Sequence, residues 1–214
     1  MLNKLIVPYD TRRFDFAGAV RAATGVPALA EWHRFHTPEG EEQPGFGNQA
    51  SEMHLKLYAI ETVSALYREF VETWVTELVG ESIRYQHVPN WRIQLPGRHA
   101  VGSYHRDRSG GHNPCEITFW VPLTDITTEN SLWVESSEGA GDFHGHPMNY
   151  GQMLAFDSAN LMHGNQRNAS ERTRVSFDFR VIPEHLYDEG LATPNHTGIN
   201  GPIQWRPSHL IGAT

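Results

Sequence analysis

The stretch GSYHRDRSGGH, residues 102–112, contains a His-x-Asp triplet whose side chains could bind a metal ion. On a strand, residues two apart point to the same face, so His105 and Asp107 could reach one ion together. His163, which follows the buried-looking stretch 151–157, is a suitable third ligand. Two histidines and a carboxylate with open positions opposite them suit iron(II), which must also hold a co-substrate and oxygen. In a chain with 13 histidines the triplet alone is a weak signal, so the other motifs decide.

Arg174 and Ser176 follow His163 after a turn of Asn, Ala, Ser and Glu. An arginine can bind a carboxylate through two parallel hydrogen bonds, and here it would hold a dicarboxylic co-substrate in one orientation opposite the metal. Arg172 and Arg180 lie on the same expected strand and compete for this role, but the spacing from His163 and the nearby serine favour Arg174.

The expected last strand, RTRVSFDFRVI at 172–182, has two chemically different faces. Most antiparallel strands bury the apolar face and expose the polar one to water. The alternative is that a helix covers the apolar face and the polar face points into a barrel. Asp178 would then need a partner, either Arg180 or Arg98, because an unpaired buried charge is costly. The polar face comprises Arg172, Arg174, Ser176, Asp178 and Arg180, and the apolar face Thr173, Val175, Phe177, Phe179 and Val181.

Taken in order, these motifs resemble the iron(II)- and 2-oxoglutarate-dependent oxygenases. The segments between them are similar to the phytanoyl-CoA hydroxylase-like branch, some of whose small bacterial members act in specialised metabolism. The resemblance covers about residues 90–182. It rests on His105-x-Asp107, Phe119-Trp-Val-Pro-Leu-Thr-Asp125, Thr128-Glu-Asn130, Gly151-Gln-Met-Leu-Ala-Phe-Asp157, His163-Gly-Asn165 and Arg174-x-Ser176.

The resemblance implies a double-stranded β-helix, with iron(II) held by the catalytic residues His105, Asp107 and His163. It further implies that 2-oxoglutarate chelates the metal through its 2-oxo acid end, and that Arg174, helped by Ser176, binds the far carboxylate. Molecular oxygen would be the other co-substrate.

Two further positions, Gln94 and Thr118, match residues that line the co-substrate pocket in this family. Related halogenases carry Gly or Ala where the metal carboxylate stands, so Asp107 implies hydroxylation or another oxidation without halide. The chain departs from the branch at Asn130-Ser-Leu-Trp133 and Ser136-Ser-Glu-Gly139, where relatives commonly have Asn-Gly-x-Leu and a Gly-Ser-His turn. These departures concern the loops that flank the site and therefore the substrate.

The expected function is thus that of a dioxygenase which couples decarboxylation of 2-oxoglutarate to hydroxylation, or a related C–H oxidation, of a small polar metabolite. Two alternatives remain. One is a cupin-like metalloenzyme that does not use 2-oxoglutarate, and the other is a non-catalytic binding protein with a jelly-roll fold.

The elements that must position these residues are mainly strands. One long amphipathic helix is expected from Ser51, a good N-cap, to Gly80. Before it, the loop 36–50 contains Pro and Gly at positions that forbid a regular element. No crossover helix is apparent after Gly80, which favours an antiparallel jelly roll over a parallel sheet. Strands are expected at 82–88, 91–95, 101–106, 115–123, 131–135, 151–157 and 172–182.

We therefore expect one mainly β domain over 1–214: a helical N-terminal cover at 1–80, a cupin-like jelly-roll core at 81–182 and a tail at 183–214. The net charge of −8 and the lack of a basic cluster disfavour nucleic acid and anionic membranes as partners. A single cysteine, Cys115, excludes an internal disulfide and a cysteine-based zinc site. The N-terminal segment fits neither a signal peptide nor a membrane span, so a cytoplasmic location is expected.

Overall fold

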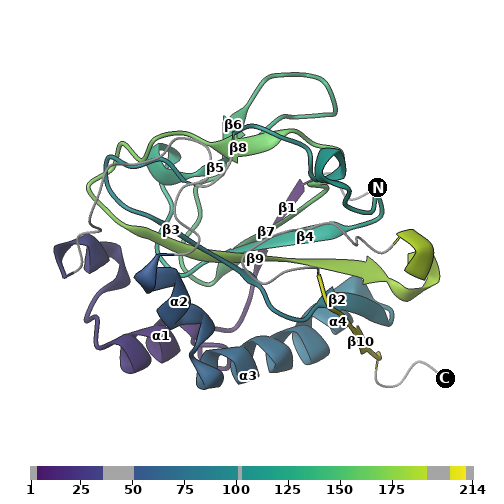
Figure 1. Ribbon diagram of the computed structural model, residues 1–214, viewed down its shortest axis with the longest axis horizontal. Coiled ribbons are helices and arrows are strands. Elements are labelled where there is room, and N and C mark those ends of the chain that lie inside the picture. The colour runs from purple at the N-terminus through teal and green to yellow at the C-terminus, as the bar shows by residue number, and fades with distance from the viewer. Residues whose placement is uncertain (1–3, 36–50, 101–102, 192–202, 211–214) are drawn as a thin grey trace.

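A computed structural model describes residues 4–35, 51–100, 103–191 and 203–210. The predicted loop 36–50 lies outside the described residues. Figure 1 shows three layers: helices below, a large sheet in the middle and a small sheet above.

The large sheet has the order β1-β7-β4-β9-β2-β10 in the described part of the chain, and β3 also pairs with β9 beside β2. Every pairing in it is antiparallel. Its strands are β1 (Lys4–Pro8), β2 (Ile83–Gln86), β3 (Asn90–Gln94), β4 (Ile117–Pro122), β7 (Gln152–Phe156), β9 (Arg174–Pro183) and β10 (Trp205–Ser208).

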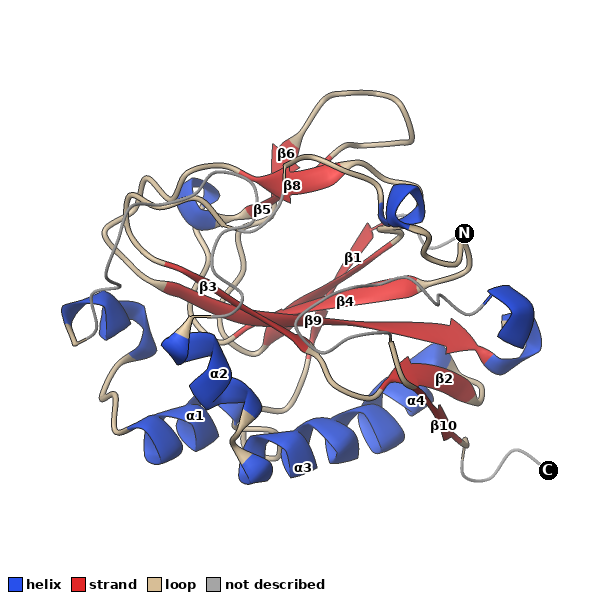
Figure 2. Ribbon diagram, in the orientation of Figure 1, coloured by secondary structure: helices blue, strands red, loops and turns tan. Residues whose placement is uncertain are grey.

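The small sheet has the order β6-β5-β8, again antiparallel, with β5 at Leu132–Val134, β6 at His144–Gly145 and β8 at His163–Asn165. Apolar side chains from both sheets meet in a buried cluster that includes Trp120, Leu132, Val134 and Leu154. Two antiparallel sheets packed over a shared interior form the predicted jelly roll, and the N-terminal helices cover its outer face (Figure 2).

Strand β9 is buried along its whole length, so neither of its faces is in water. Val175, Phe177, Phe179 and Val181 belong to the hydrophobic cluster beneath the helices. The polar residues between them therefore point into the barrel. The usual antiparallel pattern, one apolar face and one solvated face, is wrong for this strand, and the inward-facing alternative is confirmed.

The helical segment predicted between Ser51 and Gly80 begins and ends where these capping residues indicate. The Ser51 hydroxyl accepts a hydrogen bond from the backbone N–H of His54, and Gly80 adopts a left-handed conformation with φ of 80° after α4. Between them the expected single helix is interrupted. The helical segments of the described residues are α1 (Phe16–Thr24), η1 (Leu29–Arg34), α2 (Glu52–Tyr58), α3 (Glu61–Glu69), the π-helical η2 (Phe70–Val75), α4 (Thr76–Val79), η3 (Asp107–Gly110), η4 (Thr128–Asn130), η5 (Glu184–Leu186) and η6 (Glu189–Leu191).

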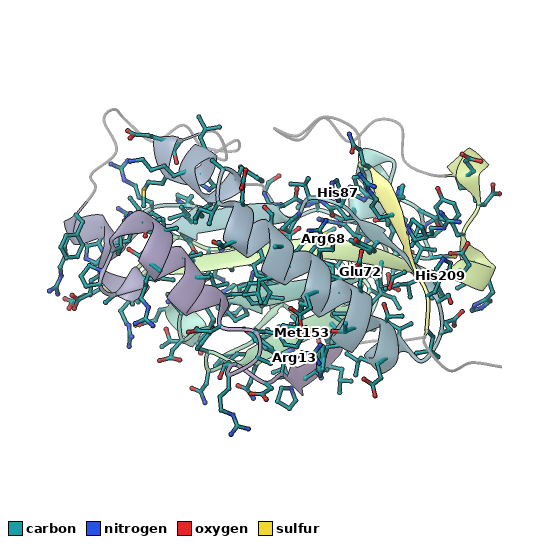
Figure 3. All side chains as sticks on the ribbon, turned by 90° about the horizontal axis from the view of Figure 1, so that it is seen from below. Arg13, Arg68, Glu72, His87, Met153 and His209 are labelled. Atoms are coloured by element: carbon teal, nitrogen blue, oxygen red, sulfur yellow. The ribbon has the colours of Figure 1, made fainter. Side chains whose placement is uncertain are left out.

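The interruption falls at Ile60, whose backbone is extended. It lets α2 turn toward the edge of β3, where the backbone N–H of Trp91 donates to the Tyr58 hydroxyl and that of Ile93 donates to Nε2 of His54. Side chains of α2 thus occupy the hydrogen-bonding edge of β3, a contact that helical periodicity does not reveal. Figure 3 shows the helical layer from below, with the segment that carries Arg68 and Glu72 lying across the strands.

The sheet also extends beyond the predicted core at 81–182. Strand β1, from the predicted helical cover, pairs with β7, and β10, from the predicted tail, pairs with β2. Their partners are far away in sequence, so local patterns did not identify them. None of the described helices is long and apolar enough to cross a membrane.

Candidate metal centre

The structure brings His105, Asp107 and His163 together where the two sheets face each other. The backbones of His105 and His163 form an isolated antiparallel bridge, with both N···O distances at 2.9 Å. The predicted strand 101–106 is wrong as a regular strand within its described part. His105 makes this single bridge, and Asp107 is the first residue of η3. Because Arg106 between them is extended, with φ of −108° and ψ of 135°, the two side chains still reach the same side.

The three side chains offer one ligand atom each, all within 4.8 Å of one another. Oδ1 of Asp107 lies 3.3 Å from Nε2 of His105 and 3.5 Å from Nε2 of His163. Adjacent ligands at about 2.1 Å from an octahedral ion are about 3 Å apart, so these separations suit one ion at the centre. Two imidazoles and one carboxylate on one side of the ion are the donor set expected for iron(II) with open positions.

Both histidines are held in the tautomer that a metal requires. Nδ1 of His105 donates to the carbonyl of Ser103 at 2.7 Å, and Nδ1 of His163 donates to the carbonyl of Leu161 at 3.0 Å. Each Nε2 therefore faces Oδ1 of Asp107, and in the neutral ring it would carry the lone pair that a metal ion needs. In the protonated ring of metal-free His105, Nε2 donates a hydrogen bond to Oδ1. Burial lowers the pKa of His163, which favours the neutral ring needed for ligation, whereas the hydrogen bond to Asp107 raises the pKa of His105.

The second oxygen of Asp107 is already engaged by protein donors. Oδ2 accepts hydrogen bonds from Oγ of Ser158 at 2.7 Å and from Nη2 of Arg180 at 2.8 Å. Burial alone would raise the pKa of Asp107, but Arg180 and the neighbouring histidines hold it well below its usual value. The carboxylate is thus ionised, and only Oδ1 is directed at the metal position.

Arg180 is the first of a row of charged side chains that contact one another along the inner face of the large sheet. Its Nη1 donates to Oδ2 of Asp178, and Nε of Arg92 donates to Oδ1 of Asp178 at 2.8 Å. Nδ2 of Asn90 also donates to Oδ2, at 3.1 Å. Of the two predicted partners for Asp178, Arg180 is confirmed, and the second partner is Arg92 in place of Arg98.

Arg174 lies in the same interior, with 1% of its surface exposed. Its Nη1 donates to the carbonyl of Asn130 at 2.8 Å, and its guanidinium carbon lies 5.5 Å from the ring centre of Trp120. Nε of Arg174 and the hydroxyl of Ser176 are buried and have no hydrogen-bond partner among the described residues. Burial lowers the pKa of Arg174 to about 9. Two adjacent buried donors without acceptors fit a bound carboxylate, which would supply them.

Gln94 and Thr118 also face this interior. Gln94 lies directly opposite Arg174 across the β3–β9 pair; its amide nitrogen donates to two backbone carbonyls, and its Oε1 is buried without a partner in the described chain. The Thr118 hydroxyl is 2.6 Å from that of Ser158, which in turn donates to Asp107. Their predicted contact with a co-substrate therefore stays a prediction, and the structure shows Thr118 linked through Ser158 to the candidate ligand Asp107.

The sequence motifs did not identify Ser158 and Arg92, and they left Arg180 as a rival to Arg174. A serine beside a predicted strand end carries no signal of its own, and Arg180 could be assigned only once Asp107, 73 residues away, was placed beside it. His112, in the loop after η3, is buried, and its Nδ1 lies 2.7 Å from Oε2 of Glu116.

The centre opens on the side of His105. Its side chain is 47% exposed, whereas those of Asp107 and His163 are 3% and 8% exposed. Beneath it, Trp120, Leu132 and Phe156 belong to the interior apolar cluster. A substrate could thus approach the ion past His105, while the inner side is closed to water.

No family model matches the chain. The streptomycin biosynthesis protein StrG of Streptomyces griseus is 34% identical over 184 residues, which are 84% of this chain and 85% of that protein. The structure of apo EctD from S. alaskensis has a TM-score of 0.59 at 14% identity, with 94% of this chain and 80% of that chain covered. That of SnoK, a non-haem alpha-ketoglutarate-dependent carbocyclase from nogalamycin biosynthesis, has a TM-score of 0.55 at 16% identity, with coverage of 85% and 80%. At such identities the two structures show the fold.

Proposed function

Because the chain belongs to the family of StrG and has the fold of the iron(II)- and 2-oxoglutarate-dependent oxygenase superfamily, we propose that it is a 2-oxoglutarate-dependent hydroxylase. The finer assignment to the phytanoyl-CoA hydroxylase-like branch stays a prediction.

The observation that carries this proposal is the pairing of two sites in one interior. His105, Asp107 and His163 form a metal site with open positions, and Arg174 and Ser176 present buried donors that lack acceptors. A metal site alone would suit many cupin-like enzymes. An unsatisfied arginine and hydroxyl in the same barrel favour a co-substrate that carries a second carboxylate.

When bound, iron(II) and 2-oxoglutarate would supply the oxidising chemistry: with O2, 2-oxoglutarate becomes succinate and CO2, and one oxygen atom enters a C–H bond of the substrate. The protein residues contribute position and environment. Arg180 and Ser158 keep Asp107 ionised and bound through one oxygen, which preserves open positions. Arg174 and Ser176 would hold the far end of the co-substrate, and the apolar cluster around Trp120 would limit access of water.

Because Asp107 is present, hydroxylation or another C–H oxidation without halide is the expected outcome, and its Oδ2 is held by Ser158 and Arg180. An engaged carboxylate at this position leaves no place for a halide on the metal, unlike the Gly or Ala of the related halogenases. StrG is named for streptomycin biosynthesis, which supports a small polar metabolite of specialised metabolism as the substrate. The predicted cytoplasmic location is consistent with one cysteine in 214 residues.

The test is an anaerobic titration of metal-free protein with iron(II) and then 2-oxoglutarate, followed by visible absorption of the metal–2-oxo acid chelate. Wild type should develop the band, the His105→Ala variant should lose it, and Arg174→Ala should require far more 2-oxoglutarate. In air, wild type should release succinate when a screened metabolite is the substrate.

Two other results would point elsewhere. Iron binding without any effect of 2-oxoglutarate would favour a cupin-like metalloenzyme. A folded protein that binds no metal, and in which Asp107→Ala leaves metabolite binding intact, would favour a binding protein.

A further inference from the structure

Arg92 is a second arginine on the inner face of the sheet, next to the Arg174 and Ser176 pair. In the β3–β9 register, Arg92 lies directly opposite Ser176, and Gln94 lies directly opposite Arg174. Trp91 and Ile93 pack against the helical side, so the side chains of Arg92 and Gln94 point inward. Its Nε donates to Asp178, but its Nη1 is buried and has no partner among the described residues.

The carboxylates of this interior are not shared evenly among its arginines. Arg180 contacts both Asp107 and Asp178 and also lies near the buried Glu116, whereas no carboxylate forms an ion pair with Arg174 among the described residues. Asp178 is shared by two of the arginines, whereas the hydrogen bond of Arg174 goes to a backbone carbonyl. The proximity of Arg92 also contributes to the lowered pKa of Arg174. An anion bound between Arg92 and Arg174 would relieve the repulsion between these two cations.

We propose that Arg92 binds the distal carboxylate of 2-oxoglutarate together with Arg174 and Ser176, so that this subsite has two arginines. The proposal rests on the proposed function. Asp178 holds Arg92 through Nε and leaves Nη1 without a partner among the described residues, and Arg92 lies opposite Ser176 in the β3–β9 register. Arg174 occupies the next inward position of β9. The three unpartnered donors, Nη1 of Arg92, Nε of Arg174 and Oγ of Ser176, can be satisfied by the two oxygens of one carboxylate.

The competing explanation is that Arg92 serves only to neutralise Asp178. The two explanations differ in the ligands whose affinity depends on Arg92. A purely structural arginine contributes equally to the binding of every 2-oxo acid, whereas a carboxylate-binding arginine contributes only to the binding of those that carry the distal carboxylate. 2-Oxopentanoate separates them, because it keeps the 2-oxo acid end and replaces the distal carboxylate by a methyl group.

The experiment is anaerobic binding of 2-oxoglutarate and 2-oxopentanoate to the iron(II)-loaded protein, with Kd taken from the chelate band and from calorimetry with manganese(II). We expect Arg92→Gln to raise the Kd for 2-oxoglutarate about 10- to 100-fold, the range for a lost hydrogen bond to a charged group. The Kd for 2-oxopentanoate should stay nearly unchanged. Arg92→Lys keeps the charge, and its Kd for 2-oxoglutarate should lie between those of Arg92→Gln and wild type. Arg84→Gln, on β2 and paired with Glu184, is the matched control and should change neither Kd.

Equal weakening of both ligands by Arg92→Gln would overturn the assignment and leave the proposed function intact. A wild type that binds the two ligands equally would overturn the proposed co-substrate, and this inference with it. A crystal structure of wild type with manganese(II) and 2-oxoglutarate needs no substitution. Nη1 of Arg92 should then lie about 2.7–3.2 Å from a distal carboxylate oxygen, and water or a substrate group in that place would contradict the assignment.

Discussion

The two oxygens of Asp107 have different roles, and the difference is imposed by neighbours. Oδ1 faces both imidazoles, while Oδ2 is fixed by Ser158 and Arg180. A carboxylate free to rotate could bind an ion through both oxygens and occupy a position that the co-substrate needs. Arg180 is therefore a positioning residue for the metal site.

We predict that Arg180→Met destabilises the metal-free protein by about 3–5 kcal/mol, because it removes the partner of a buried carboxylate. Metal affinity should also fall about 10- to 100-fold, as for other residues that support a metal ligand. Urea denaturation and equilibrium dialysis with manganese(II) measure the two effects. Arg84→Met, whose ion pair with Glu184 is part-exposed, should cost about 1 kcal/mol or less. Equal losses in the two variants would contradict the role given to Arg180.

At this scale the sequence named candidate site residues that the structure brings into one interior, and it missed the residues that contact them. His105, Asp107, His163 and Arg174 could be chosen by residue type, spacing and family resemblance. Ser158 and Arg92 could not, because their function exists only in contacts across the fold, such as the 51 residues between Ser158 and Asp107.

At the scale of elements, the metal site depends on close contact between β8 and the segment before η3. A Cβ atom on Gly164 would lie 2.9 Å from Cγ and 3.0 Å from Cα of Tyr104, nearer than such atoms approach in proteins. Gly164 thus allows the backbone bridge between His105 and His163 to form.

We predict that Gly164→Ala pushes Tyr104 away, opens this bridge and weakens metal binding by about tenfold or more, the penalty seen when ligand support is disturbed. Gly110→Ala is the control, since its Cβ would meet only His112 at 3.9 Å. Manganese(II) dialysis should separate the two variants. Unchanged affinity in Gly164→Ala would show that the bridge does not set the ligand geometry.

The contact between α2 and β3 predicts a pH dependence of stability. Burial lowers the pKa of His54 to about 3, far below its ordinary value of 6.5. Below pH 6.5 the unfolded chain takes up a proton that folded His54 does not, so stability is lost as the pH falls toward 3. Between pH 6.5 and 5 this amounts to about 2 kcal/mol, at about 1.4 kcal/mol per pH unit.

Urea denaturation at pH 7 and pH 5 should therefore show a smaller loss of stability for His54→Gln than for wild type. The exposed His209→Gln should follow wild type. An equal decline in the free energy of unfolding from pH 7 to pH 5 in all three proteins would rule out His54 as the source of the pH dependence.

Sequence patterns identified α2 to α4 by their caps but not the break at Ile60. The caps are local, as Ser51 and Gly80 show, whereas the break depends on His54 and Tyr58 binding the edge of β3. Similarly, β9 was found by its alternation, and only the packing of helices on one face showed that its polar side chains point inward.

At the scale of the whole molecule, the proposed metal and co-substrate would bind between the two sheets and so should stabilise both. At 100 times Kd, a ligand that binds only the folded state adds about 2.7 kcal/mol. For a chain of this size we expect the Tm to rise by about 5–10 °C, at about 2–4 °C per kcal/mol. Thermal unfolding with manganese(II) and 2-oxoglutarate measures this. Asp107→Asn should abolish the shift, and a shift that persists in that variant would place the ligands elsewhere.

The central position of β9 also has a consequence for biosynthesis. Strands β2 and β3 pair with β9, and Asn90 precedes its partner Asp178 by 88 residues. During translation both strands leave the ribosome long before β9 exists, and the helices that should cover β9 have nothing to pack on. Until residue 183 emerges, the nascent chain therefore has unpaired strand edges and exposed aromatic side chains. Such a state favours aggregation and would depend on chaperones.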